Sequence, residues 1–194
     1  MRVIAGRLGG RRLSAPKGAS TRPTSDRVRE ALFSVLGDVT GTNVLDLYAG
    51  TGALGIEALS RGARRAVFVE SARPALAVLK KNLEDLGLTG ETRAIGQPVA
   101  RAIDVIAQEG PFDLILLDPP YAALAEAALA VDRLMERASP SGGSGTEVLS
   151  ESGLLVLEHA SRDAPPELAR LERTATRPYG EASLSFYERR ALTG

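Results

Sequence analysis

The chain has 194 residues, which is enough for one domain with a substantial hydrophobic core. Its 44% hydrophobic and 25% charged residues are typical of a globular protein, and no apolar run approaches the roughly 20 residues that span a bilayer. The sequence contains no cysteine, which excludes disulfides, a thiolate zinc site and a cysteine nucleophile. Because the first residues also lack the apolar segment of a signal peptide, we expect a cytoplasmic protein.

Positive charge is concentrated at the N-terminus, although the chain as a whole is neutral. Residues 1–36 have a net charge of +6, and the remainder has −6. We interpret residues 1–36 as a basic extension, formed by an arm or small hairpin and a helix, and residues 37–194 as the main domain. A basic arm is typical of proteins that bind nucleic acid, although a solvated terminus has the same composition.

Apolar periodicity and turn residues predict alternating helices and strands. Helices are predicted at 26–36, 54–61, 73–86, 99–108 and 122–138, and strands at 44–48, 66–70, 92–96, 112–118, 153–158, 170–177 and 183–189. Strands that alternate with helices predict an α/β fold with a doubly wound parallel sheet. The last two strands have no helix between them, which predicts an antiparallel hairpin at one edge.

A glycine turn links the strand at 44–48 to the following helix, in the sequence Asp46-Leu47-Tyr48-Ala49-Gly50-Thr51-Gly52. Glycine lets a backbone turn tightly and approach a ligand closely. In open α/β sheets, ligands bind at the carboxyl ends of the strands. Glu70 ends the next predicted strand, where an acid can bind both hydroxyls of a ribose. The pattern therefore predicts a nucleoside cofactor.

The glycines alone do not identify that cofactor. Gly50-x-Gly52-x-x-Gly55 also matches the turn that binds a dinucleotide pyrophosphate at a helix N-terminus. Asp46 favours a different ligand, because its carboxylate would repel a pyrophosphate but could bind the ammonium of a methionine moiety. A tight turn without any ligand is the structural alternative.

A second motif, Asp118-Pro119-Pro120-Tyr121, follows the most apolar predicted strand. The prolines fix the backbone and remove two N–H donors, so that the carboxylate and the turn carbonyls can only accept hydrogen bonds. An exocyclic amine offers two N–H donors, and Tyr121 offers a flat surface on which an extruded base can stack. The motif predicts methylation of an amine. A rigid turn with a packed tyrosine is the structural alternative.

Together these motifs resemble class I methyltransferases that act on amines. The string Arg22-Pro23-Thr24-Ser25-Asp26-Arg27-Val28-Arg29-Glu30-Ala31-Leu32-Phe33 resembles the N-terminal signature of the bacterial RsmD family, the 16S rRNA (guanine(966)-N(2))-methyltransferases. Residues 2–6, Tyr179-Gly180 and Phe186-Tyr187 match the same family. The resemblance therefore covers nearly the whole chain.

The resemblance implies a Rossmann-like, doubly wound, seven-stranded and mostly parallel sheet with a small N-terminal hairpin and helix. It implies methyl transfer from S-adenosylmethionine to N2 of one guanine in 16S rRNA, within the assembled small ribosomal subunit. We expect the enzyme to be a monomer and to contain no metal. The predicted cofactor residues are Asp46, Tyr48, Gly50, Thr51, Gly52, Glu70 and Gln97. The predicted catalytic residues are Asp118, Pro119, Pro120 and Tyr121. The predicted RNA-binding residues are Arg7, Arg11, Arg12, Arg22, Arg27 and Arg29.

One segment departs from the family pattern. Many relatives carry an acid after the third strand that helps to fix the adenine, whereas this chain has Ile95-Gly96-Gln97-Pro98. We expect the Gln97 amide or a backbone N–H to take that place.

Other functions share parts of the pattern. An adenine-N6 methyltransferase uses the same Asp-Pro-Pro-Tyr chemistry, but DNA enzymes of that kind usually need an additional target-recognition region. A protein-glutamine methyltransferase usually has Asn before Pro-Pro-Tyr. An RNA-binding protein without turnover and an NAD-dependent oxidoreductase are further alternatives. This sequence shows no residues that would position a nicotinamide, which argues against the oxidoreductase.

Overall fold

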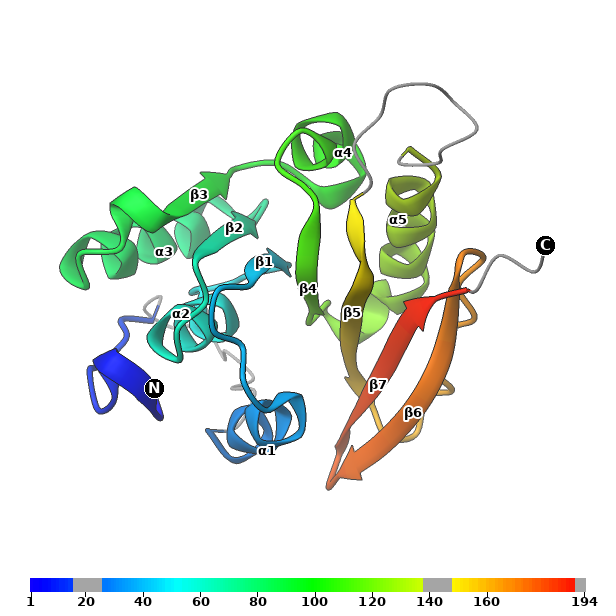
Figure 1. Cartoon of the computed structure of the whole chain (residues 1–194), viewed down its shortest axis with the longest axis horizontal. Helices are drawn as coiled ribbons and strands as arrows, with labels where there is room; N and C mark the ends of the chain where they lie inside the picture. The colour runs from blue at the N-terminus through cyan, green and yellow to red at the C-terminus, as the bar shows by residue number, and fades with distance from the viewer. Residues whose placement is uncertain (16–25, 138–147, 191–194) are drawn as a thin grey trace. The chain divides into compact units, whose positions relative to one another are not determined.

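The computed structural model describes residues 1–15, 26–137 and 148–190. Seven strands form a mostly parallel sheet accompanied by helices, which confirms the predicted α/β fold class (Figure 1). The chain consists of two compact units, Met1–Pro98 and Val99–Gly194. The first unit contains both the basic arm and three strands, and the domain boundary after residue 36 stays a prediction.

The first unit consists of alternating helices and strands after the arm. Its elements are η1 (Gly6–Leu8), α1 (Asp26–Leu36), β1 (Asn43–Leu47), α2 (Ala53–Ser60), β2 (Arg65–Val69), α3 (Arg73–Asp85), η2 (Thr89–Glu91) and β3 (Thr92–Ile95). The strands are parallel in the order β3-β2-β1, and α2 packs against β1 and β2. Their apolar interiors are buried on both faces, as expected for a covered parallel sheet.

The strand ends of the first unit are aligned. Leu47 is paired with Val69, and Val69 with Ile95. The turns that follow β1, β2 and β3 therefore leave the sheet at the same edge, which is where α/β sheets bind ligands.

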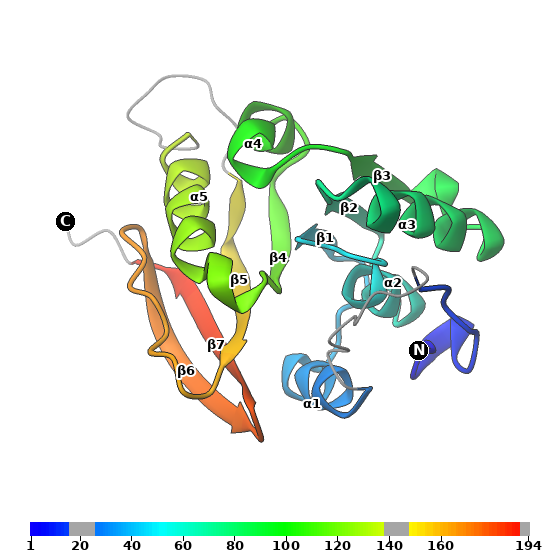
Figure 2. The same ribbon diagram turned by 180° about the vertical axis from the view of Figure 1, so that it is seen from behind.

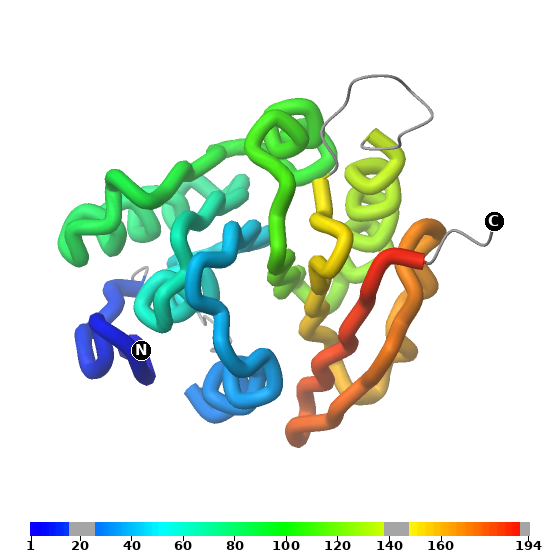
Figure 3. The backbone as a smooth tube through the Cα atoms, viewed as in Figure 1, coloured from blue at the N-terminus to red at the C-terminus, as the bar shows by residue number. Residues whose placement is uncertain are grey.

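The basic arm forms a small hairpin, whose strands meet at the antiparallel bridge between Arg2 and Arg12. The Val3 N–H donates to the Arg11 carbonyl at 2.9 Å, and the Gly10 N–H donates to the Val3 carbonyl at 2.9 Å. Val3 and Leu13 are buried, so the hairpin is packed against the unit. Figure 3 traces this N-terminal segment, in blue, beside α2.

Helix α1 begins at Asp26, as the capping pattern predicts. Val28, Leu32 and Phe33 are buried on one face of the helix, and Leu36 is half-buried at the last residue.

The described residues of the second unit form two α-helices, one short 3-10 helix and four strands. Its elements are α4 (Val99–Ala107), β4 (Phe112–Leu117), η3 (Tyr121–Ala123), α5 (Leu124–Arg137), β5 (Leu149–Ala160), β6 (Leu171–Tyr179) and β7 (Ala182–Arg189). The strand order is β4-β5-β7-β6, and α5 lies beside the strands in both views (Figure 1, Figure 2). Strands β6 and β7 are antiparallel, which confirms the predicted hairpin at one edge.

Strand β5 is longer than its apolar core predicts. It begins at Leu149 rather than at 153, and Leu149 pairs with Phe112 of β4. Residues 150–152 are polar, which is why the pattern indicates a loop there. The next pair along the strands is Leu114 with Leu154, so residues 150–153 lie in an irregularity between the two pairs. The Ser150 hydroxyl donates to Asp113 at 3.0 Å there. In the described part of the chain, no helix combines the length and apolar character required to cross a membrane.

Candidate active site

The glycine turn after β1 uses left-handed backbone at three positions. Tyr48, Gly50 and Gly52 have φ values of 60°, 56° and 84°. Glycine adopts this conformation at little cost, whereas a tyrosine is strained, and such strain is often found at functional sites. A Cβ built on Gly50 meets no heavy atom within 4 Å among the described residues, its chain neighbours aside. The turn therefore has room for a ligand in front of Gly50.

The other two glycines of the motif serve packing. A Cβ on Gly52 would lie 2.4 Å from Leu79 Cδ1, and one on Gly55 would lie 2.4 Å from Phe68 Cε1. Both distances are far below van der Waals contact. Gly52 and Gly55 are therefore required for the close approach of α2 to its neighbours, whichever cofactor binds.

Glu70 holds the glycine turn from the end of the next strand. Its Oε2 accepts the Gly50 N–H at 2.7 Å, and its Oε1 accepts the Ala72 N–H at 2.7 Å. The side chain is half-exposed, and each carboxylate oxygen has a second lone pair. Glu70 can therefore fix the turn and still accept hydrogen bonds from a bound ligand.

Asp46 is buried below the same turn. It is 1% exposed, and its Oδ2 accepts the Gly55 N–H at 2.9 Å. A carboxylate in the first turn of a helix stabilises its unpaired N–H groups and the positive end of its dipole. Asp46 therefore fixes the start of α2, and direct contact with a methionine ammonium stays a prediction.

The remaining predicted cofactor residues differ in exposure. Thr51 is buried, and its carbonyl accepts a hydrogen bond from the Asn82 amide at 3.0 Å. Gln97 is exposed and lies two residues beyond Ile95, whose carbonyl accepts the Glu70 N–H at 3.0 Å. The structure thus brings the turn, Glu70 and the segment of Gln97 to one edge of the first unit.

These residues fit S-adenosylmethionine. The acceptor-only Glu70 suits the two hydroxyl donors of a ribose, and the space at Gly50 lets a ligand approach the backbone. An aligned strand edge with a glycine turn and an acid on the neighbouring strand is a nucleoside-binding arrangement.

The second motif forms a separate turn in the second unit. Asp118 follows the last residue of β4 and is partly exposed, Pro119 is buried, and Pro120 is exposed. Tyr121 begins the short helix η3, and the Ala123 N–H donates to the Pro120 carbonyl at 2.7 Å. The turn is therefore rigid, and Asp118 and Tyr121 are both accessible at its ends.

The predicted RNA-binding arginines fall into three groups. Arg7, Arg11, Arg12 and Arg27 are exposed, although Arg7 pairs with Glu91 and Arg11 donates to the Asp85 carbonyl at 3.2 Å. Arg22 lies outside the described residues. Arg29 is completely buried, so the prediction that it binds RNA is wrong for this structure.

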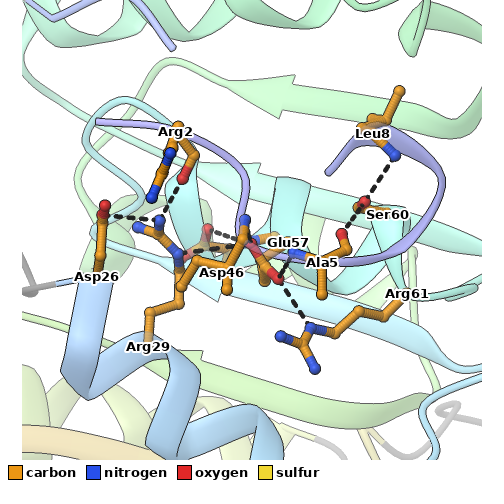
Figure 4. A network of polar contacts seen from close by, with 11 residues as sticks. Arg2, Ala5, Leu8, Asp26, Arg29, Asp46, Glu57, Ser60 and Arg61 are labelled. Carbon is orange, nitrogen blue, oxygen red and sulfur yellow. Dashed lines mark hydrogen bonds and ion pairs between the residues drawn. The ribbon is translucent and has the colours of Figure 1, made fainter. Parts of the chain in front are cut away.

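Arg29 instead belongs to a buried polar network (Figure 4). Its Nη2 donates to the Arg2 carbonyl and to Asp26 Oδ1, and its Nε lies 3.6 Å from Glu57 Oε2. The sequence analysis assigned Arg29 to the basic extension because of the positive charge of residues 1–36. A buried arginine needs an acidic partner, and only the fold places Glu57 beside it.

Two buried residues of the first unit were not predicted, namely Glu57 on α2 and Asn82 on α3. Glu57 is fully buried, and Asn82 is 2% exposed. The available signal was a single acid within the apolar stretch Ile56 to Leu59, followed by Arg61 four residues later. The sequence gives no comparable signal for Asn82.

His159 is buried in the second unit. Its Nδ1–H donates to the Ala160 carbonyl at 3.0 Å, and Nε2 lies 2.9 Å from Ser185 Oγ. Both ring nitrogens are therefore used within the fold.

Comparison with known proteins identifies the family. A family model described as Conserved hypothetical protein 95 matches residues 1–188. A Bacillus subtilis protein with the provisional name rRNA methyltransferase YlbH is 37% identical over 193 residues, or 98% of this chain and 100% of that protein. Ribosomal RNA small subunit methyltransferase D of Escherichia coli is 42% identical over 123 residues, which cover 62% of this chain and 60% of that relative.

The structural comparison agrees. A structure from Escherichia coli, provisionally described as the methyltransferase YhhF, has a TM-score of 0.76 and 33% identity, and the match covers 99% of both chains. The chain therefore belongs to the family of Conserved hypothetical protein 95, the RsmD family of S-adenosylmethionine-dependent methyltransferases.

Proposed function

We propose that this methyltransferase transfers a methyl group from S-adenosylmethionine to the exocyclic N2 of one guanine in 16S rRNA. The observation that carries the proposal is the full-length similarity to a relative whose provisional name is that of an rRNA methyltransferase. The Asp-Pro-Pro-Tyr turn after β4 supplies the chemistry, because it presents acceptors to an amine.

The cofactor residues are those at the aligned strand edge of the first unit. Glu70 accepts the ribose hydroxyls, the backbone at Tyr48 and Gly50 borders the cofactor, and Gln97 contacts the adenine. Asp46, Thr51 and Gly52 maintain the turn from below. S-adenosylmethionine supplies an electrophilic methyl group on a sulfonium, so the protein does not need a nucleophile or a metal of its own.

The Asp118 turn orients the amine. The carboxylate and the neighbouring carbonyls accept the two N–H bonds, and this directs the nitrogen lone pair away from the turn. As the N–CH3 bond forms and the S–CH3 bond breaks, S-adenosylhomocysteine is the leaving group, the nitrogen becomes acidic, and one proton passes to an Asp118 oxygen or to water. Pro119 and Pro120 keep the acceptors fixed, and Tyr121 stacks on the extruded base.

The exposed arginines of the arm and of α1 bind the RNA backbone in this proposal. Arg7, Arg11, Arg12 and Arg27 are exposed, and arginine suits bidentate contacts with phosphate. We propose that the substrate is 16S rRNA within the assembled small subunit and that the enzyme acts as a monomer.

The identity of the methylated nucleoside tests the proposal. The chain is incubated with methyl-labelled S-adenosylmethionine and, separately, naked 16S rRNA, unmodified small subunits and double-stranded DNA, and the products are digested to nucleosides. N2-methylguanosine from the ribosomal substrate is the expected product. N6-methyladenosine, from RNA or DNA, would establish the adenine-N6 alternative instead.

A further inference from the structure

The arm is attached to α2 through its own backbone. The N–H groups of Ile4 and Ala5 donate to the two carboxylate oxygens of Glu57, at 2.8 and 3.0 Å. The Leu8 N–H donates to Ser60 Oγ at 2.9 Å. Gly6 has a φ of +78°, and a Cβ there would lie 1.9 Å from the Ser60 carbonyl oxygen, so only glycine permits this approach. The arm is thus a packed part of the first unit.

Glu57 is the centre of this attachment (Figure 4). Besides the two arm amides, it accepts Arg61 Nε at 2.8 Å and faces the buried guanidinium of Arg29. Arg61 also lies over the Phe33 ring of α1, 5.0 Å from its centroid. One buried carboxylate therefore connects the arm, α1 and α2.

Asn82 makes a second and more direct connection. Its Oδ1 accepts the Ser14 N–H at 2.8 Å, and its Nδ2 donates to the Ser14 carbonyl at 3.2 Å and to the Thr51 carbonyl at 3.0 Å. Ser14 belongs to the arm, and Thr51 lies between the two glycines of the cofactor turn. A single buried amide thus joins the backbones of the arm and the turn.

The two connections end on adjacent parts of the chain, because Thr51 lies two residues before the first residue of α2. Helix α2 carries Glu57, and its first turn is fixed by the bond from Gly55 to Asp46 below the glycine turn. A movement of α2 therefore shifts Glu57, which accepts the N–H groups of Ile4 and Ala5. A movement of the turn at Thr51 shifts Asn82, which accepts the Ser14 N–H.

We propose that Asn82 is a positioning residue that couples the arm to the cofactor turn, with Glu57 as the fixed anchor of the arm. Cofactor binding then stabilises the attachment of the arm, and a ligand that binds the attached arm strengthens cofactor binding by the same factor. This inference rests on the proposed function, which assigns the cofactor to the turn and RNA to the arm.

Hydrogen exchange of the full chain tests the coupling without RNA and without turnover. The amides of Ile4, Ala5, Leu8 and Ser14 are followed with and without S-adenosylhomocysteine, and calorimetry verifies that this ligand binds. We expect exchange at these amides to slow about fivefold or more when the ligand is bound. Binding of the ligand with unchanged exchange would overturn the coupling alone. Absence of binding would overturn the proposed cofactor site, and the coupling with it.

Two variants assign the coupling to Asn82. Asn82→Asp keeps an acceptor for the Ser14 N–H but loses the donor to Thr51, so Ser14 should stay protected while its response to S-adenosylhomocysteine disappears. Asn82→Ala should also lower affinity for this ligand about fivefold or more. Lys81→Ala is the matched control, because Lys81 is exposed on the same helix and pairs with Asp85 rather than with the arm or the turn. An Asn82→Asp variant that responds like the wild type would contradict the assignment.

Discussion

The glycine turn after β1 and the proline turn after β4 both follow buried apolar strands, yet they are held in different ways. The glycine turn is flexible by composition and is fixed by side chains, with Glu70 on Gly50, Asp46 on Gly55 and Asn82 on Thr51. The proline turn is fixed by its own rings. Substitutions near the first turn should therefore change structure and cofactor binding together, whereas Asp118 can be changed with little effect on the fold.

The largest effect is expected at Glu57, the buried carboxylate of α2. Glu57→Gln removes the negative charge opposite Arg29, whose Nε and Nη1 have no hydrogen-bond partner among the described residues. Leaving a buried charge without its partner costs about 3–5 kcal/mol. Urea unfolding measures the loss. Glu84→Gln, at an exposed position on α3, should leave the free energy of unfolding within about 0.5 kcal/mol of wild type.

Asp118→Ala should lower turnover and leave stability unchanged, whereas Glu57→Gln should lower stability. We expect turnover to fall by about 10²–10³, because the amine loses its charged acceptor, while S-adenosylhomocysteine affinity and the free energy of unfolding stay near wild type. Single-turnover kinetics and calorimetry separate these quantities. Asp104→Ala, which removes an exposed acid of the same unit, is the control. A large loss of cofactor affinity in Asp118→Ala would argue against the division of roles between the turns.

Tyr187 of β7 allows the second unit to be perturbed by pH. Burial raises the pKa of the Tyr187 phenol to about 12, and its hydroxyl donates to the Pro166 carbonyl at 2.9 Å. A pKa that is higher in the folded state gives stability that is complete below pH about 10 and is lost as pH rises toward 12. The loss should be on the order of 2 kcal/mol, measured as urea unfolding at several pH values. Tyr187→Phe should remove this part of the slope, and an unchanged slope would exclude Tyr187 as its source.

Glu70→Gln tests the acceptor at the glycine turn. The amide retains only one acceptor oxygen for the two backbone N–H groups and the ribose, so S-adenosylhomocysteine affinity should fall about tenfold, as measured by calorimetry. Asp85→Asn, an exposed substitution on α3, should not change it. Unchanged affinity in Glu70→Gln would remove Glu70 from the cofactor site.

The smallest effect is expected at the exposed arginines. Arg12→Gln together with Arg27→Gln should weaken RNA binding several-fold and reduce the slope of affinity against salt concentration by about 1–2. Filter binding at several salt concentrations measures the slope. The double variant Arg64→Gln and Arg162→Gln removes the same charge at other exposed positions and serves as the control. An equal change in slope for both pairs would mean that total charge, not the arm, determines binding.

Sequence patterns predicted most of the fold because its elements are encoded locally. The strands are short apolar runs, and turns such as Gly180 and the Asp26 helix start lie where composition places them. The start of β5 at Leu149 was missed because the pairing of Leu149 with Phe112 and the register shift before Leu154 are long-range features that local propensity does not encode.

The candidate site was predictable only in part, because local sequence patterns do not encode long-range contacts. The glycine turn and Glu70 are linked by a fixed spacing, and the structure joins them through the Gly50 N–H. Arg29 and Glu57 lie on different helices, and Asn82 binds backbone atoms of Ser14 and Thr51, so their roles depend on long-range packing. The sequence therefore indicated the chemistry of the site but not the buried side chains that support it.

The central claim, methylation of one specific guanine in the small subunit, is tested most directly by product stoichiometry. Unmodified small subunits are treated to completion with the wild-type chain and labelled S-adenosylmethionine, and nucleosides are quantified by mass spectrometry, with Asp118→Ala in parallel. The account predicts a single N2-methylguanosine per particle for the wild type and almost none for the variant. Several methyl groups per particle, or a product other than N2-methylguanosine, would contradict it.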